Sequence, residues 1–230
     1  MTQLVRDEGV VLGRQDYMET DVLVTLFTRG HGKLRLVAKR ARRISGESGA
    51  YLDLTNRVAV IYYSRRGLPL LKEASLVRSF PQIRADLTRA EAALQGLALA
   101  GEILPEQQPQ PEAYRLLLSV LQALEGGGAA RRILLSFGLH LVETLGYGPH
   151  LAGCVVCGAT ESLTWSGERG GLLCRECGGE GEVLSPAFWR YLLALQRLSV
   201  WAAGWVAMKE EEVEKAWDLF RQFLSYQLKR

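Results

Sequence analysis

The chain has 230 residues, of which 48% are hydrophobic and 23% are charged, a composition typical of a globular protein and unlike that of a disordered chain. No uninterrupted apolar run reaches the roughly 20 residues that a membrane span needs. The first residues carry charges where a secretion signal needs an apolar stretch. We therefore expect a cytoplasmic protein with reduced thiols and no membrane contact.

The net charge of +3 is unevenly distributed along the chain. Residues 1–84 contain 15 Lys and Arg against 8 Asp and Glu, whereas residues 85–230 contain 13 basic and 17 acidic side chains. A basic N-terminal part predicts a polyanionic partner. A solvated positive surface without a partner is the alternative, because charge alone does not identify a ligand.

The first 80 residues alternate apolar and polar side chains, which is typical of β-strands. Residues 20–28 and 33–38 flank a short glycine-containing turn and predict a hairpin, with Lys33 and Arg35 facing outward. The other predicted strands are 9–12, 57–63 and 69–76. Five short strands fit a small closed barrel, for which we predict an OB-fold; a five-stranded SH3-like barrel is the main alternative.

Beyond Pro81, Ala, Leu, Glu and Arg recur at helical spacing. The predicted helices cover residues 82–104, 111–124, 129–145, 185–200 and 208–228. Ser185 suits the cap of one helix and Pro186 its first position. The sequence therefore predicts an α+β protein, with a barrel domain over residues 1–80 and an all-helical domain over residues 81–230.

All four cysteines lie in two CxxC pairs, Cys154 with Cys157 and Cys174 with Cys177, separated by 16 residues. A two-residue spacer lets both thiolates of a pair reach one tetrahedral metal ion. Four thiolates leave no open position for a catalytic water, so we expect one structural zinc ion within a zinc-binding segment at residues 150–180. Unmetallated thiol pairs and a redox site are the alternatives, although a redox CxxC belongs in a βαβ context that is absent.

Residues 29–46 contain seven basic side chains and no acidic one, and two more arginines follow the strand at 57–63. Such cations can bind a phosphate backbone by releasing its counterions. The candidate DNA contacts are Lys33, Arg35, Lys39, Arg40, Arg42, Arg43, Arg65 and Arg66. Tyr51, Tyr62 and Tyr63 are candidates for stacking on bases, with a place in the barrel core as the alternative.

Sequence signatures of catalysis are absent. The chain lacks a GxxxxGK[ST] phosphate loop and a GxGxxG turn after a strand, and it lacks the HxE partner that a zinc deaminase would need. Its three histidines show no recognisable arrangement with a nucleophile. We therefore expect a protein that is not an enzyme and has no small-molecule substrate.

The segment from Asp21 to Arg43, which includes TLFTRGHGKLRLVAKRARR, resembles the start of RecO proteins. The order of parts is also similar: a barrel, a helical domain, and a CxxCG…CxxCG insertion between helices. This resemblance extends over essentially the whole chain. The combination of hairpin, zinc motif and domain order is more specific than the zinc motif alone.

The resemblance implies an OB-fold that binds single- and double-stranded DNA and anneals complementary strands without a nucleotide. It implies that the protein, together with RecR, helps to load RecA onto DNA covered by single-strand-binding protein, in a nucleoid-associated cytoplasmic setting. Some members of the family bind the acidic tail of single-strand-binding protein on the helical domain, where Arg131 and Arg132 are the basic candidates. Other members lack the cysteines, which favours an architectural role for zinc.

Three other functions remain open from the residues alone. A zinc loop that binds DNA is disfavoured by its five glutamates against Arg169 and Arg175. An enzyme would need a catalytic side chain that the sequence does not reveal. The third is a zinc-stabilised adaptor whose barrel recognises an acidic protein partner. Only a direct binding test would distinguish it from a DNA-binding protein.

Overall fold

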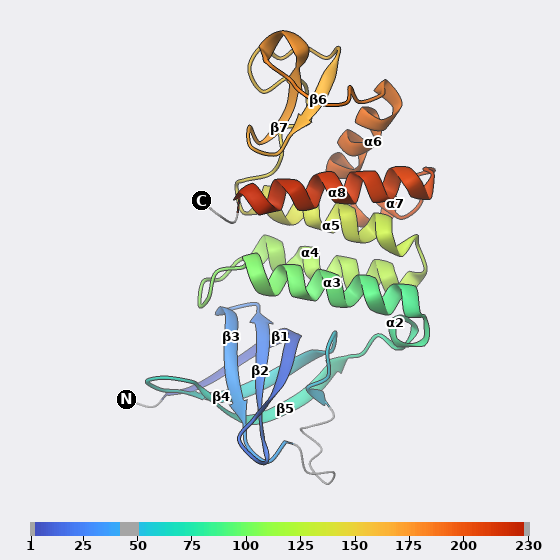
Figure 1. Cartoon of the computed structure of the whole chain (residues 1–230). Helices are drawn as coiled ribbons and strands as arrows, with labels where there is room; N and C mark the ends of the chain where they lie inside the picture. Colours follow the sequence, from blue (N-terminus) through green and yellow to red (C-terminus); the bar gives the residue numbers. More distant parts are fainter. Residues whose placement is uncertain (1–2, 42–50, 228–230) are drawn as a thin grey trace. The chain divides into compact units, whose positions relative to one another are not determined.

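The structure, a computed structural model, describes residues 3–41 and 51–227 (Figure 1). The chain folds into two compact units, residues 1–125 and residues 126–230. Of the described elements, the first contains the β-barrel and helices α2 to α4, and the second contains helices α5 to α8 and the cysteine-rich segment. No helix within the described ranges combines the length and the apolar character needed to cross a membrane.

Five strands of the first unit close into a barrel in the order β1-β2-β3-β5-β4. Their bounds are β1 (Gln3–Tyr17), β2 (Asp21–Thr28), β3 (Gly32–Ala38), β4 (Arg57–Ser64) and β5 (Leu70–Arg78). Neighbouring strands are antiparallel except β3 and β5, which pair in parallel at Val37 and Leu70. This barrel, followed by helices, confirms the predicted α+β fold with an N-terminal five-stranded barrel.

The barrel core is built from the apolar positions that alternate along the strands. Val22, Val24 and Leu26 of β2 are fully buried together with Leu36 of β3, and Leu34 of β3 is 7% exposed. Burial of such side chains stabilises the fold by about 1.5–3 kcal/mol each. The core therefore explains why the period-2 pattern located these strands correctly.

Strand β1 is much longer than the predicted segment 9–12. Its first half pairs with β4 and its second half with β2, with a register shift between Val11 and Gly13. Backbone hydrogen bonds to two different neighbours extend the strand, while apolar side chains mark only its middle. Local side-chain alternation could not reveal this length.

The described helices that follow the barrel in the first unit are α2 (Pro81–Ala85), α3 (Leu87–Ile103) and α4 (Pro111–Gly126). They lie over one end of the barrel (Figure 1). The predicted helix 82–104 is interrupted at Asp86, whose side chain caps α3 by accepting a hydrogen bond from the Arg89 amide. Tyr114 of α4 packs edge-on against Phe27 of β2, with ring centroids 5.8 Å apart.

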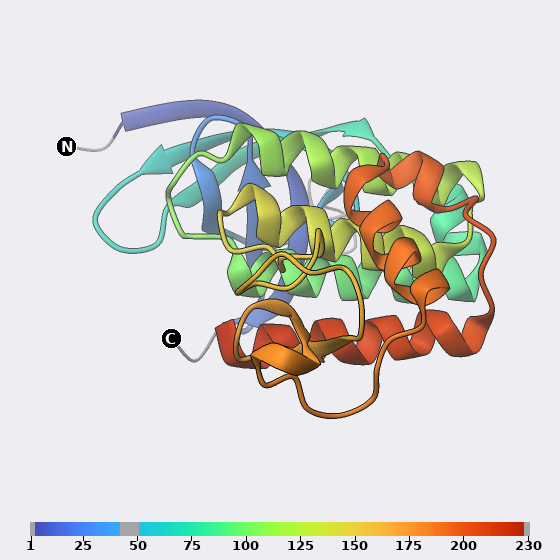
Figure 2. The same ribbon diagram turned by 90° about the horizontal axis from the view of Figure 1, so that it is seen from above.

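The second unit contains α5 (Ala130–Thr144), α6 (Pro186–Arg197), α7 (Val200–Ala203) and α8 (Glu210–Gln227). Helix α5 contacts the other three (Figure 2). The Ser185 side chain accepts a hydrogen bond from the Phe188 amide, so the predicted helix cap is confirmed. Phe220 of α8 lies over Gly138 of α5, where an added Cβ would come 2.5 Å from the ring.

The cysteine-rich segment lies between α5 and α6. It contains a hairpin of β6 (Leu163–Ser166) and β7 (Gly171–Cys174), followed by the 3-10 turn η1 (Arg175–Cys177). The sequence did not predict this hairpin, because strands of four residues are too short to show a periodic pattern. The hairpin leads directly into the second cysteine pair.

Candidate nucleic-acid interface and metal centre

Five of the candidate DNA contacts are exposed cations in the described part of the barrel: Arg35, Lys39, Arg40, Arg65 and Arg66. Arg35 lies on β3, Lys39 and Arg40 directly follow it, and the two others occupy the β4–β5 turn. This turn lies beside β3, because the amide of Val37 donates a hydrogen bond to the Pro69 carbonyl at 2.9 Å. The fold therefore brings two separate basic segments together.

Few carboxylates neutralise these cations. Arg35 Nε lies 3.8 Å from Glu106 Oε1, and Arg65 Nε donates to the Leu68 carbonyl at 2.8 Å. Among the described residues, no carboxylate lies within ion-pair distance of the side chains of Lys39, Arg40 and Arg66. We call the five exposed cations the basic strip; exposed cations of this kind can contact phosphates.

Lys33 leaves the barrel interior as predicted, but the segment joining α3 and α4 covers it. Its Nζ donates a hydrogen bond of 2.6 Å to the carbonyl of Gly101 near the end of α3. Its own carbonyl accepts a hydrogen bond from the Gln107 amide at 2.9 Å. The residue is 9% exposed, so its ammonium group is engaged in a contact within the protein.

The neighbouring Gly32 explains the close approach of this segment. Its φ is +72°, and a Cβ at this position would lie 2.1 Å from the Gln108 carbonyl oxygen. Only glycine fits both the left-handed backbone and the close contact. The glycine-lysine pair of the hairpin therefore joins the barrel to the helices of the first unit.

The remaining sequence candidates differ in their position. Arg42 and Arg43 lie outside the described residues. Tyr62 is 3% exposed and belongs to the barrel core, while Tyr51 packs partly buried against that core and Tyr63 is partly exposed. Burial, assisted by the charge of Asp7, raises the pKa of Tyr62 to about 12. Tyr62 therefore has no open face for a base to stack on.

The four cysteines converge in the second unit. Their Sγ atoms all lie within 4.8 Å of one another, and Cys157 Sγ and Cys174 Sγ are 3.6 Å apart. A tetrahedral zinc ion with Zn–S bonds of about 2.3 Å places its sulfurs about 3.8 Å apart. The cysteines therefore fit a metal ion with four sulfur ligands.

Two tight turns position the thiols. Gly158 and Gly178, which follow the second cysteine of each pair, have φ values of +76° and +90°. Their amides donate to the carbonyls of Cys154 and Arg175 at 2.9 and 3.2 Å. Each turn thus closes around its cysteine pair, in the way that the CxxCG spacing predicted.

The thiols differ in acidity. A hydrogen bond from the Cys174 backbone lowers the pKa of Cys154 to about 6, while a hydrogen bond with Cys157 raises the pKa of Cys177 to about 12. Only the thiolate binds a metal ion. Four thiols in this space ionise together only when a cation compensates their charge, which supports a metal centre.

Arg131 and Arg132 are both engaged within the second unit. Arg131 forms an ion pair with Glu214 of α8. Arg132 donates to the Met208 carbonyl at 3.0 Å and lies 3.5 Å from Glu210 Oε1. These contacts hold α5 against the start of α8, while the Arg131 side chain stays 54% exposed.

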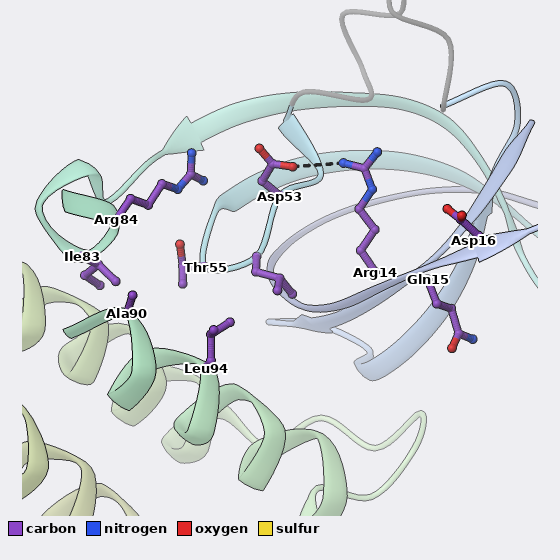
Figure 3. A pocket seen from close by; sticks show the side chains of 10 residues that line it. Arg14, Gln15, Asp16, Asp53, Thr55, Ile83, Arg84, Ala90 and Leu94 are labelled. Carbon is purple, nitrogen blue, oxygen red and sulfur yellow. Dashed lines mark hydrogen bonds and ion pairs between the residues drawn. The ribbon is translucent and has the colours of Figure 1, made fainter. Parts of the chain in front are cut away.

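A polar contact that the sequence did not predict fixes the tip of the β2–β3 hairpin. Asp7 Oδ2 lies 2.6 Å from His31 Nδ1, and the Asp7 carboxylate accepts a hydrogen bond from the Gly30 amide at 3.2 Å. A cavity beside the barrel, lined among others by Arg14 and Thr55, was not predicted from the sequence either (Figure 3). Both combine residues far apart in the chain, so no local pattern signals them.

Comparison with known proteins identifies the family. The family model described as "Recombination protein O N terminal" matches residues 1–80, and the one described as "Recombination protein O C terminal" matches residues 84–230. The DNA repair protein RecO of Geobacter sulfurreducens is 36% identical over 191 residues, which are 82% of this chain and 79% of that protein. Those of Roseiflexus sp. and Desulfatibacillum aliphaticivorans are each 30% identical, over 99% and 97% of this chain and 82% and 92% of their own lengths. The chain therefore belongs to the RecO family of DNA repair and recombination proteins.

Proposed function

We propose that this chain is a recombination mediator that binds single- and double-stranded DNA through the basic strip and anneals complementary strands. With RecR it helps to load RecA onto DNA covered by single-strand-binding protein. The observation that carries the proposal is the basic strip itself: five exposed cations from two barrel segments, in a chain of the RecO family. The protein acts by binding and has no catalytic step of its own.

The physical basis of annealing is charge neutralisation. Two complementary strands repel each other through their phosphates, and cations on one surface reduce this repulsion. Tyr62 is buried in the core, so its ring cannot hold a base by stacking. Bases held by their phosphates alone keep their pairing edges open to a second strand.

We also propose that Cys154, Cys157, Cys174 and Cys177 hold one structural zinc ion. Zinc matches a set of four sulfur ligands at these separations. With every coordination position filled by protein, the ion stabilises the fold of residues 150–180 and activates no water. DNA binding by the barrel is then independent of the metal.

The contact with RecR and with the acidic tail of single-strand-binding protein belongs to the same proposal. Arg131 and Arg132 are already engaged with Glu214 and with the start of α8. Binding of the tail through these two arginines would have to break those contacts. A tail that binds there would replace Glu214 and Glu210 as partners of the two arginines.

The test is fluorescence anisotropy with a labelled single-stranded oligonucleotide over a salt series. The variant Lys39→Gln/Arg40→Gln removes two cations from the basic strip. The control Arg115→Gln/Arg221→Gln removes two exposed cations that pair with Glu112 and Asp218 on α4 and α8. Both variants change the net charge equally, so only the position of the charge differs.

We expect the wild type to bind with a steep salt dependence. The strip variant should lower the slope of log K against log salt by about 1.4, since each phosphate contact on a single strand contributes about 0.7. The control should keep the wild-type slope. Equal effects of both variants, or no binding at low salt, would reject the basic strip and favour an adaptor whose barrel binds an acidic protein.

A further inference from the structure

A cavity of about 730 Å³ lies beside the barrel within the first compact unit (Figure 3). Its walls come from the end of β1, from residues 53–55, and from α2 and α3. None of the described residues of the basic strip lines it. A volume of this size is within the usual range of ligand sites, so the cavity can hold more than solvent.

The two walls of the cavity differ chemically. The barrel side presents the polar groups of Arg14, Gln15 and Asp53, whereas the helix side presents the apolar Ile83, Ala90 and Leu94 together with the guanidinium group of Arg84. A ligand that fits both walls has a hydrogen-bonding edge and an apolar face. A purely apolar or a purely ionic ligand matches only part of this lining.

Thr55 adds an unused hydrogen-bonding group to this cavity. The residue is 4% exposed, and its Oγ1 has no hydrogen-bond partner among the described residues. Figure 3 shows this hydroxyl pointing toward the side of Asp53 and Arg84. Buried hydroxyls nearly always have a partner, so an incoming polar group would complete this one.

The charges of the cavity are balanced. Arg14 NH1 lies 3.0 Å from Asp53 Oδ1, and Arg84 NH2 donates to Asn56 Oδ1 at 2.7 Å. Asp16 supplies a second carboxylate to the lining. A phosphate or an acidic peptide would meet two carboxylates as well as two guanidinium groups. The lining therefore favours an uncharged ligand.

We propose that this cavity receives one unpaired base of a single DNA strand. A nucleobase is uncharged, has two apolar faces and carries donors and acceptors along its edge. Guanidinium, carboxylate, amide and hydroxyl groups are the side chains that pair with base edges. Aliphatic side chains such as Leu94 can cover the face of the ring. The inference rests on the proposed function, since it presupposes that the barrel binds single strands.

The basic strip reaches the same end of the barrel as the cavity. The Arg40 amide donates a hydrogen bond to Asp21 at the start of β2, and Asp21 pairs with Tyr17 at the end of β1. Arg14 lies three positions earlier on that strand. A strand whose phosphates contact Lys39 and Arg40 is thus near the cavity mouth. One base held there would fix the strand while its neighbours stay available for pairing.

The experiment compares two labelled strands of equal length, an oligothymidine and an abasic strand with the same phosphates. Anisotropy gives the affinity ratio between them for the wild type and for three variants. Ala90→Phe fills the cavity, and Thr55→Val removes the hydroxyl while keeping the shape of the side chain. Leu87→Phe is the matched control, because Leu87 is 81% exposed on the same helix and does not line the cavity.

We expect the wild type and Leu87→Phe to bind oligothymidine roughly fivefold or more tightly than the abasic strand, as a single buried base provides. Ala90→Phe should bring this ratio close to one without changing the affinity for the abasic strand. Thr55→Val should reduce the ratio in part. If circular dichroism shows that Ala90→Phe is unfolded, the affinity ratio of Thr55→Val tests the proposal instead.

Two other results have distinct meanings. Equal binding of both strands by the wild type would overturn the base site and leave the cavity to a protein segment, while the proposed function would stand. Failure to bind either strand at low salt would instead reject the proposed function. The base site would also be overturned if Thr55→Val and Ala90→Phe both fold and both keep the wild-type ratio of affinity for oligothymidine to affinity for the abasic strand.

Discussion

The ammonium group of Lys33 donates a hydrogen bond of 2.6 Å to the carbonyl of Gly101, which joins the barrel hairpin to the last turn of α3. A cation at the C-terminal end of a helix also interacts favourably with the helix dipole. The sequence placed Lys33 among the candidate DNA contacts. Its geometry supports a structural role in the first unit.

Replacement of Lys33 by Met separates these two roles. Lys33→Met keeps the aliphatic stem but loses the charged hydrogen bond, so we expect the free energy of unfolding to fall by about 1.5–3 kcal/mol. The matched variant Lys39→Met, at an exposed position, should change stability by less than about 0.5 kcal/mol. DNA affinity should fall in Lys39→Met and stay unchanged in Lys33→Met. Urea unfolding and anisotropy measure both, and the reverse pattern of affinities would contradict the structural role.

A second contact between barrel and helix involves Tyr114, whose hydroxyl donates to Glu8 Oε1 at 3.0 Å; the same oxygen lies 2.5 Å from Arg57 Nε. Tyr114→Phe removes a hydrogen bond to a charged group and should lower the free energy of unfolding by about 1.5–3 kcal/mol. Tyr63→Phe, on a partly exposed side chain, is the control and should change little. Equal stability of Tyr114→Phe and the wild type in urea would show that the bond contributes nothing.

The second unit offers a test of close helix contact at Gly138. An added Cβ would lie 2.5 Å from the buried ring of Phe220, so Gly138→Ala should destabilise the protein by about 1–3 kcal/mol despite the better helix propensity of Ala. Gly101→Ala, in α3, meets no atom within 4 Å and should be neutral or stabilising by up to about 1 kcal/mol. Thermal unfolding followed by circular dichroism compares the two. A higher melting temperature for Gly138→Ala would mean that α5 and α8 pack less closely.

If the four cysteines hold the proposed zinc ion, its removal should affect the two units differently. A chelator, or Cys154→Ser, should expose the hairpin β6–β7 and change the fluorescence of Trp165, because four ligands fix the fold of this segment. The barrel should still bind single-stranded DNA. Val156→Ala, at an exposed position between the first two cysteines, should keep one zinc ion per chain by elemental analysis. DNA affinity that follows zinc content would link the two units functionally.

Alkaline pH provides a test of the buried tyrosines. Burial raises the pKa of Tyr62 and that of Tyr191 from 10.0 to about 12. Between these values the unfolded chain has lost protons that the folded chain retains, so the free energy of unfolding should fall as pH rises from about 10 to 12. Tyr62→Phe should weaken this dependence. A pH profile in urea that is flat in this range would contradict the burial of both hydroxyls.

Much of the fold was determined by local sequence. The alternation in residues 20–28 and 33–38 predicted β2 and β3, because one face of each strand has to be buried. The spacing of the cysteines predicted their convergence, since two residues between thiols allow one tight turn around a metal. Ser185 predicted a helix start, because its side chain bonds an amide three residues away. Each of these signals acts over a few residues.

Contacts between segments far apart in the chain decide which polar side chains reach the surface. Lys33 and Arg35 alternate identically along β3, yet the α3–α4 segment covers Lys33 and leaves Arg35 exposed. The length of β1 and the cavity at Thr55 also depend on segments that meet only in the folded chain. A local pattern records which side of a strand a residue faces. Long-range contacts decide which segment packs against that side of the strand. They therefore determine whether a cation binds a helix end, as Lys33 does, or stays exposed, as Arg35 does.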